Sequence, residues 1–227
     1  MKINIEYIDN EIIIPDNKVF NIEIENKIYF YRLINELNYI SNGADSPEED
    51  NIKFFKNNNE LNLFNKIDVY IDYFNIDFNS KKIINSLYRV LKTTISEEDK
   101  IKIANYYLKI KNILSKSFLD YNLPLTISSE YDIELIFKLL KINVEKKNYL
   151  LDNLLILIDI NNIFKINELL IFVNLKQYLN KEELNELYKY SVYNNVKILL
   201  IDSQSYGTCN EYEKKLIIDS NLDEFLL

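Results

Sequence analysis

The pattern that most restricts the fold is a strand–helix–strand sequence between residues 168 and 202. An apolar run at 169–173 (LLIFV) precedes a helical stretch, and a second apolar run follows at 196–201. Continuous apolar runs of this length are typical of strands buried on both faces of a parallel sheet, and parallel strands need a crossover connection. The pattern predicts a βαβ unit, the building block of nucleotide-binding α/β domains.

A phosphate-binding loop is missing from this scaffold. Such a loop needs glycine for close backbone approach and a lysine followed by a hydroxyl residue. The whole chain has two glycines, Gly43 and Gly207, and the stretch after the predicted strand 19–25 reads NKIY. The apolar run at 169–173 ends in Asn174, a weaker metal ligand than a carboxylate. Asp202 ends the second run alone, a position that also suits a turn or cap, so we expect no nucleotide cofactor.

Composition excludes several classes of catalytic site. The 227 residues contain no histidine and one cysteine, Cys209. This excludes Ser-His-Asp and Cys-His catalysis, imidazole zinc sites and an internal disulfide. The chain has no N-terminal apolar segment with a cleavage site and no apolar run of membrane-spanning length. We therefore expect a cytoplasmic protein without membrane association, and not an enzyme.

The order of patterns along the chain predicts two domains. Residues 3–14 read as a β-hairpin, and 19–25 and 67–74 as strands. From residue 80 to about 164 a helical period dominates, with capping patterns at Ser96 and Ser129. A last strand is predicted at 214–219. The economical division is an α/β domain made of residues 1–80 and 150–227, with an α-helical domain, residues 81–149, inserted into it.

Charge is unevenly distributed between these segments. The formal net charge is −8, yet residues 81–148 contain 13 Lys or Arg against 8 Asp or Glu, a balance of +5. Lysine supplies almost all of the positive charge, because Arg32 and Arg89 are the only arginines. Flexible point charges suit the neutralisation of phosphates, whereas reading of base edges usually needs arginine. The segment therefore predicts binding of DNA without sequence preference.

Eight lysines of this segment are the candidate DNA contacts. Three of them are spaced by seven residues and share one helical face. The eight are Lys102, Lys109, Lys111, Lys116, Lys138, Lys141, Lys146 and Lys147. Each also fits an ordinary solvated helix face.

The segment 169–202 (LLIFVNLKQYLNKEELNELYKYSVYNNVKILLID) resembles a known family, the small CRISPR-associated spacer-acquisition protein of type II-A systems. The hairpin, the strand at 67–74 and the helical stretch IELIFKLLKINVE (133–145) support the resemblance. It implies a degenerate P-loop-NTPase-like head with an N-terminal β-hairpin and an inserted α-helical leg. It also implies a homotetrameric ring that encloses double-stranded DNA at free ends, with the integrase complex and effector nuclease as partners and no catalytic activity.

The resemblance adds expectations for particular residues. Lys138 lies in ELIFKLLK, which is similar to a basic position on the inner surface of the family's ring. Calcium is implied as a stabilising ion, and the family's acidic leg segment corresponds to residues 118–134. The calcium ligands expected there are Asp120, Glu130, Asp132 and Glu134.

Two other classes of function remain open from the sequence. The chain fits a protein–protein adaptor, because a basic middle segment can meet acidic flanks of neighbouring copies. It also fits a nuclease or NTPase that uses carboxylates and a divalent cation, with Asp202 as the candidate residue.

Overall fold

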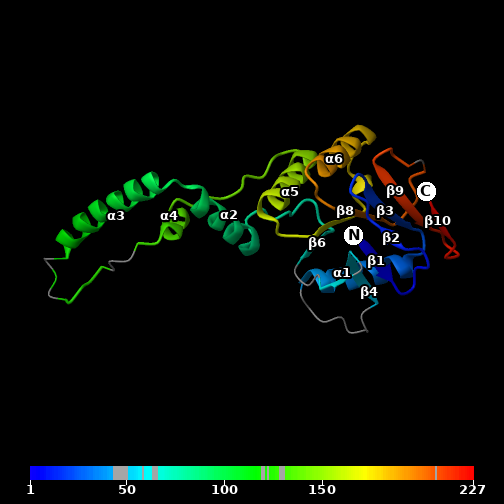
Figure 1. The fold of residues 1–227 in the computed structure, drawn as a ribbon, viewed down its shortest axis with the longest axis horizontal. Helices are drawn as coiled ribbons and strands as arrows, with labels where there is room; N and C mark the ends of the chain where they lie inside the picture. The colour runs from blue at the N-terminus through cyan, green and yellow to red at the C-terminus, as the bar shows by residue number, and fades with distance from the viewer. Residues whose placement is uncertain are drawn as a thin grey trace. The chain divides into compact units, whose positions relative to one another are not determined.

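The computed structural model describes residues 1–42, 51–57, 59–62, 66–118, 121, 123–127, 131–207 and 209–227. Contacts divide the chain into two compact units. Residues 1–77 together with 146–227 form one, which we call the α/β unit, and residues 78–145 form the other, the helical unit. Figure 1 shows the helices and strands of both.

The α/β unit contains a mainly parallel sheet, in the order β10-β9-β3-β8-β7-β6 among the described residues. All neighbouring pairs are parallel except β10 and β9, which pair antiparallel at one edge. The strands are β3 (Val19–Ile24), β6 (Ile67–Tyr70), β7 (Leu169–Val173), β8 (Ile198–Asp202), β9 (Glu213–Ile218) and β10 (Glu224–Leu226). The mixed α/β class predicted from the sequence is confirmed.

The predicted βαβ unit occupies the middle of this sheet. It consists of β7, the helix α6 (Lys181–Tyr193) and β8, with a short 3-10 turn, η1 (Leu175–Gln177), before the helix. Asn180 and Glu183 form a capping box that fixes the start of α6. Every residue of β7 and β8 is buried, because helices cover both faces of the sheet (Figure 1).

A smaller antiparallel sheet extends the predicted N-terminal hairpin. The hairpin pairs β1 (Lys2–Ile5) with β2 (Ile12–Ile13), with Lys2 opposite Ile13. On its other edge β1 pairs with β4 (Ile52–Lys56), which in turn pairs with β5 (Asn59–Leu61). The sequence patterns did not predict β4 and β5.

The main core lies between the two sheets and α1 (Lys27–Asn42). Ile3 and Ile12 of the small sheet join Leu33 and Leu37 of α1 and one face of the main sheet. The opposite face of the main sheet carries α5 (Leu150–Phe164), which packs against α6 (Figure 1). The two faces of the central strands therefore meet different surroundings, one wholly apolar and the other partly polar.

The helical unit contains α2 (Lys81–Thr94), α3 (Glu97–Ser117) and α4 (Ile133–Leu139). Ser80, Ser96 and Asp132 cap their N-termini by accepting hydrogen bonds from backbone N–H groups. A small core of Tyr88, Ile133 and Phe137 joins α2 to α4. In the part of the chain that is described, no helix combines the length and apolar character needed to cross a bilayer.

Candidate functional site

The N-terminus of α1 is the place where a nucleotide-binding fold would bind phosphate. Here a side chain caps it. The Asn26 side-chain oxygen accepts hydrogen bonds from the backbone N–H groups of Ile28 and Tyr29, at 3.1 and 3.2 Å. These are first-turn donors that a bound phosphate would use. Asn174 plays a similar internal role, because its Oδ1 accepts from the Ser203 N–H at 2.8 Å.

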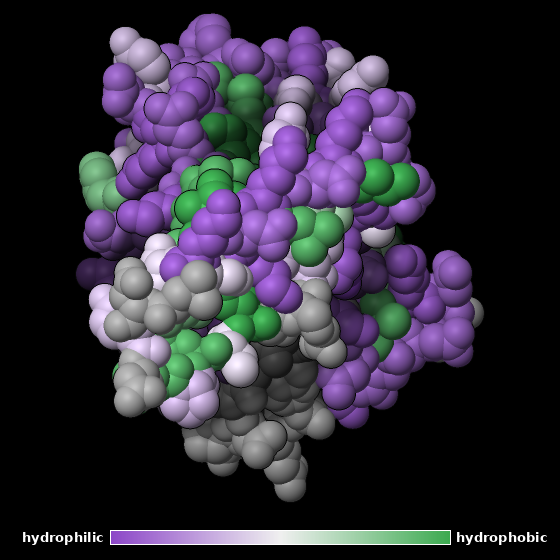
Figure 2. All heavy atoms as spheres, turned by 90° about the vertical axis from the view of Figure 1, so that its left-hand side faces the viewer, coloured by the Kyte–Doolittle hydropathy of each residue, from purple (hydrophilic) through white to green (hydrophobic). Residues whose placement is uncertain are grey.

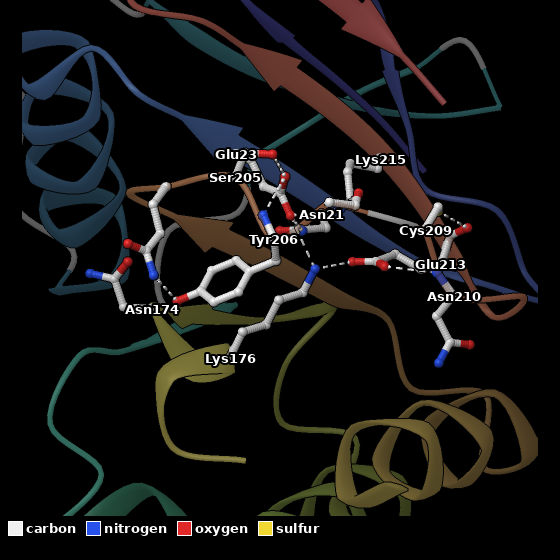
Figure 3. Close-up of polar contacts among 12 residues, drawn as sticks. Asn21, Glu23, Asn174, Lys176, Ser205, Tyr206, Cys209, Asn210, Glu213 and Lys215 are labelled. Atoms are coloured by element: carbon white, nitrogen blue, oxygen red, sulfur yellow. Dashed lines mark hydrogen bonds and ion pairs between the residues drawn. The ribbon is translucent and has the colours of Figure 1, made fainter. Parts of the chain in front are cut away.

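A network of charged side chains lies buried on the polar face of the main sheet (Figure 3). Glu23 of β3 accepts hydrogen bonds from the ammonium groups of Lys215 at 2.8 Å and Lys176 at 3.2 Å. Lys176 also contacts Glu213 at 2.5 Å. The side chains of Glu23 and Lys215 are 0% exposed and that of Lys176 is 6% exposed. We call these four residues the buried charge network.

Opposite charges favour the ionised forms of Glu23 and Lys176. Burial by itself would raise the pKa of Glu23, but the Lys215 hydrogen bond and the charges of Lys176 and Lys215 hold it below its usual value. Burial would likewise lower the pKa of Lys176, and the Glu213 carboxylate outweighs it and raises that pKa. A charge removed from this network would leave its partner buried and unpaired.

Asp202 lies beside the buried charge network. Its Cα is paired with that of Glu23 across β8 and β3, and the residue is 0% exposed. Among the described residues, no group forms a hydrogen bond of good geometry with either carboxylate oxygen, although the Lys176 backbone N–H is near enough to lower the pKa of Asp202. Burial, with the Glu23 and Glu213 charges, raises the pKa of Asp202 to about 7 against the opposing charge of Lys176. Asp202 is therefore neither a cap nor a surface turn residue.

The lysines of α3 follow an acidic first turn. Lys102 contacts Glu98 at 2.7 Å and Asp99 at 3.4 Å, so acids of its own helix offset its charge. Beyond that turn, residues 100–119 contain five lysines and no acid. Lys109 and Lys116 are exposed, whereas Lys111 is half-buried on another side of the helix. Lys109 and Lys116 are therefore exposed on one face of α3, whereas acids of the first turn neutralise Lys102.

The lysines of α4 lie at its C-terminal end. Lys138 is exposed in the last turn, where positive charge is favourable. Lys141 is exposed just beyond the helix and has a left-handed backbone, with φ of 52°. Both belong to the helical unit, together with the α3 lysines.

Lys141 can lose its charge without loss of stability. Its left-handed backbone suits glycine, so Lys141→Gly is expected to raise the free energy of unfolding by about 0.5 kcal/mol. Lys138→Gly is the matched control and is expected to lower it by about 1 kcal/mol, because that residue is inside α4. Urea unfolding followed by circular dichroism measures both values, and equal destabilisation by the two changes would contradict the assignment.

Lys146 and Lys147 belong to the α/β unit, whereas the other six candidate lysines belong to the helical unit. The Lys146 ammonium donates a hydrogen bond to the Phe74 carbonyl at 2.5 Å. The Lys147 backbone N–H donates to the Asn153 side chain at 2.8 Å. Lys146 therefore joins this segment to the loop after β6, and Lys147 joins it to α5.

The acids expected to bind calcium are only partly described. Asp120 and Glu130 lie outside the described residues. Asp132 caps α4 by accepting from the Glu134 N–H at 3.0 Å, and Glu134 contacts Lys92 at 3.2 Å. Within the described ranges no group of three or more Asp, Glu, His or Cys is placed to hold a metal ion. Asp132 and Glu134 thus already have partners inside the helical unit.

The buried charge network was not predicted from the sequence. A signal for it exists, because β3 and β9 carry Glu23 and Lys215 in the middle of strands that pair on both sides. A strand inside a parallel sheet is covered on both faces, so alternate charged residues in it must be buried and must find partners.

Comparison with known proteins identifies the family. A family model described as CRISPR-associated protein (Cas_Csn2) matches residues 46–222. The chain belongs to the Cas_Csn2 family. The resemblance to the CRISPR-associated spacer-acquisition protein drawn from the sequence is therefore confirmed, and the chain is a CRISPR adaptation-related protein. A comparison with curated protein sequences gives no significant match.

One solved structure agrees with this membership at the level of fold, and a second has a weaker similarity. The crystal structure of Stu0660 of Streptococcus thermophilus matches 100% of this chain and 76% of its own, with a TM-score of 0.60 and 14% identity. A dimeric post-hydrolysis state of the ATP-binding cassette MJ0796, bound to ADP and phosphate, matches 100% of this chain and 98% of its own, with a TM-score of 0.46 and 12% identity.

Proposed function

We propose that this Cas_Csn2 member is a non-enzymatic protein of CRISPR spacer acquisition that binds double-stranded DNA, preferably at free ends, without reading its sequence. The observation that carries the proposal is the acid-free stretch of α3, which presents lysines in a chain of net charge −8. A local excess of positive charge in an acidic protein suits a phosphate backbone. Membership of the Cas_Csn2 family supports a role in the CRISPR system. The proposed partners are the integrase complex and the effector nuclease, and the proposed location is the cytoplasm.

The α/β unit would act as the degenerate P-loop-NTPase-like head, and the helical unit as the leg. Asn26 supports a head that does not bind nucleotide, because its side chain uses the first-turn donors of α1. The complete burial of Asp202 weighs against the alternative of a carboxylate-dependent nuclease or NTPase, since a catalytic carboxylate must reach its substrate or metal.

Assembly into a ring of four copies is supported by apolar side chains on α3. Tyr106, Ile110, Ile113 and Leu114 recur at helical spacing and are 63%, 55%, 65% and 49% exposed. An exposed apolar stripe of this length needs a cover, and a second copy of the chain would supply it. In the face drawn in Figure 2, apolar residues stand in separate patches among hydrophilic ones. The protein–protein adaptor alternative would instead join copies through the basic helical unit and the acidic flanks of neighbouring copies, without DNA.

A salt titration tests the proposal. Binding of the intact protein to a fluorescent 40-base-pair duplex is expected to weaken by about 10³-fold between 50 and 200 mM NaCl, provided that six or more phosphates are contacted. Unlabelled duplexes of unrelated sequence are expected to compete equally. Fluorescence anisotropy measures both effects. Binding that ignores salt, or that prefers one sequence strongly, would contradict sequence-independent phosphate contact.

A further inference from the structure

The loop formed by residues 203–207, which follows β8, is held by the buried charge network. Glu23 accepts hydrogen bonds from the Ser205 hydroxyl at 3.1 Å and the Tyr206 N–H at 3.2 Å. Lys215 donates to the Gly207 carbonyl at 3.0 Å, and the Lys176 ammonium lies 5.6 Å from the centre of the Tyr206 ring. Figure 3 shows these side chains converging on the loop. The position of the loop therefore depends on how the network distributes its charges.

Asp202 directly precedes this loop, and its charge state changes the balance of the network. Two ammonium groups, of Lys176 and Lys215, balance the carboxylates of Glu23 and Glu213. An ionised Asp202 adds a third negative charge, and among the described residues no group forms a hydrogen bond of good geometry with it. The other titratable groups that face it are the phenols of Tyr73 and Tyr188, and neither can supply a positive charge.

Other buried polar atoms near Asp202 are also without partners. Among the described residues these include the Tyr188 hydroxyl of α6 and the Asn21 Oδ1 of β3. Asn21 lies on the same face of β3 as Glu23, to which its amide donates at 3.0 Å. A carboxylate in such surroundings has few polar contacts of its own, so its ionised form competes for the contacts of its neighbours.

We propose that release of a proton from Asp202 loosens residues 203–207 and so makes this loop responsive to pH. The ionised carboxylate competes with Glu23 and Glu213 for Lys176, and Glu23 is the group that holds the loop. A cavity of about 260 Å³ lies beside the network, lined by Lys176, Tyr206, Cys209 and Glu213 among others. Loosening of the loop would widen access to this cavity.

Hydrogen exchange of the intact protein tests the proposal. After correction for intrinsic rates, opening of the backbone amides of 203–207 is expected to increase about tenfold between pH 6 and pH 8, because the open state holds Asp202 ionised. In Asp202→Asn the opening is expected to be the same at both pH values. Glu186→Gln, an exposed acid of α6, is the control and should keep the wild-type response. An equal response in wild type and Asp202→Asn overturns the proposal.

A second measurement serves if Asp202→Asn does not fold. Carbon-13 chemical shifts of the Asp carboxyl groups in the wild-type protein are expected to include one group that titrates with a midpoint near 7. Absence of any Asp carboxyl titrating above pH 6 overturns the proposal.

Discussion

Replacement of Glu23 by glutamine is expected to lower the free energy of unfolding by about 3–5 kcal/mol, because it leaves two buried ammonium groups without their shared carboxylate. Lys176 and Lys215 would each lose a contact, and Ser205 and Tyr206 would face an uncharged acceptor. For a chain of this size the loss corresponds to a fall of about 10 °C in melting temperature. Urea unfolding at pH 8 measures it.

The matched control is Glu25→Gln, two residues further along at an exposed position. It is expected to change the free energy of unfolding by less than about 0.5 kcal/mol. The pKa of Glu23 is lowered in the fold, so its contribution is present above the usual range of a carboxyl group and is lost as pH falls through the folded pKa. If Glu23→Gln lowers the free energy of unfolding by less than about 1 kcal/mol at pH 8, the buried charge network contributes little to stability.

Removal of four charges from the helical unit is expected to weaken binding of duplex DNA by at least about 100-fold at 150 mM salt and to reduce the slope of affinity against salt. The variant is Lys109, Lys111, Lys116 and Lys138 changed together to glutamine. All four lie in the helical unit, and the three on α3 lie beyond the acids Glu98 and Asp99 that offset Lys102. Fluorescence anisotropy with a short duplex measures the affinity.

A control with the same change in net charge separates local from overall electrostatics. Exposed lysines of the α/β unit, namely Lys27, Lys53, Lys66 and Lys181, are changed together to glutamine. This variant is expected to bind within about threefold of wild type, because distant charges are screened at this salt. If both variants lose affinity equally, the helical unit is not the DNA interface. If the helical-unit variant fails to assemble while its affinity per subunit is unchanged, the adaptor alternative is favoured.

The strands and helices with strong apolar periodicity were predictable. The βαβ unit, α5 and the strand β9 lie close to where the patterns place them, because buried parallel strands and long helices have distinct periods. The short strand β6 ends at Tyr70 rather than continuing to residue 74. Asp72 ends it by accepting hydrogen bonds from the Phe74 and Asn75 N–H groups, which forms a local turn.

Other elements depend on contacts that periodicity does not reveal. β4 and β5 are short, and β4 is defined by its pairing with β1 far away in the chain. The N-cap of α4 is Asp132 rather than Ser129, because the Asp132 carboxylate accepts from the Glu134 N–H. Ser129 lies outside the described residues. Such choices between two nearby capping residues are decided by local packing rather than by sequence spacing.

The sequence predicts the positive charge of the candidate site but not how its side chains are arranged. The excess of lysine in the middle of the chain is visible in the sequence, but its division into acid-paired Lys102, hydrogen-bonded Lys146 and exposed Lys109 requires side-chain positions. Glu23 and Asp202 required knowledge of the strand order, because only neighbouring strands bring them together. The sequence shows a single charged residue in an apolar strand but does not identify the residue that pairs with it.

The most direct test of the proposed function compares two forms of one DNA molecule. Equal amounts of a plasmid in linear and in covalently closed circular form compete for the intact protein at 150 mM salt, and the retained DNA is measured. A ring that is threaded at free ends predicts that linear DNA is retained at least tenfold better, and that joining its ends removes the preference. Equal retention of the two forms would contradict threading and would leave a protein that binds duplex DNA only from the side.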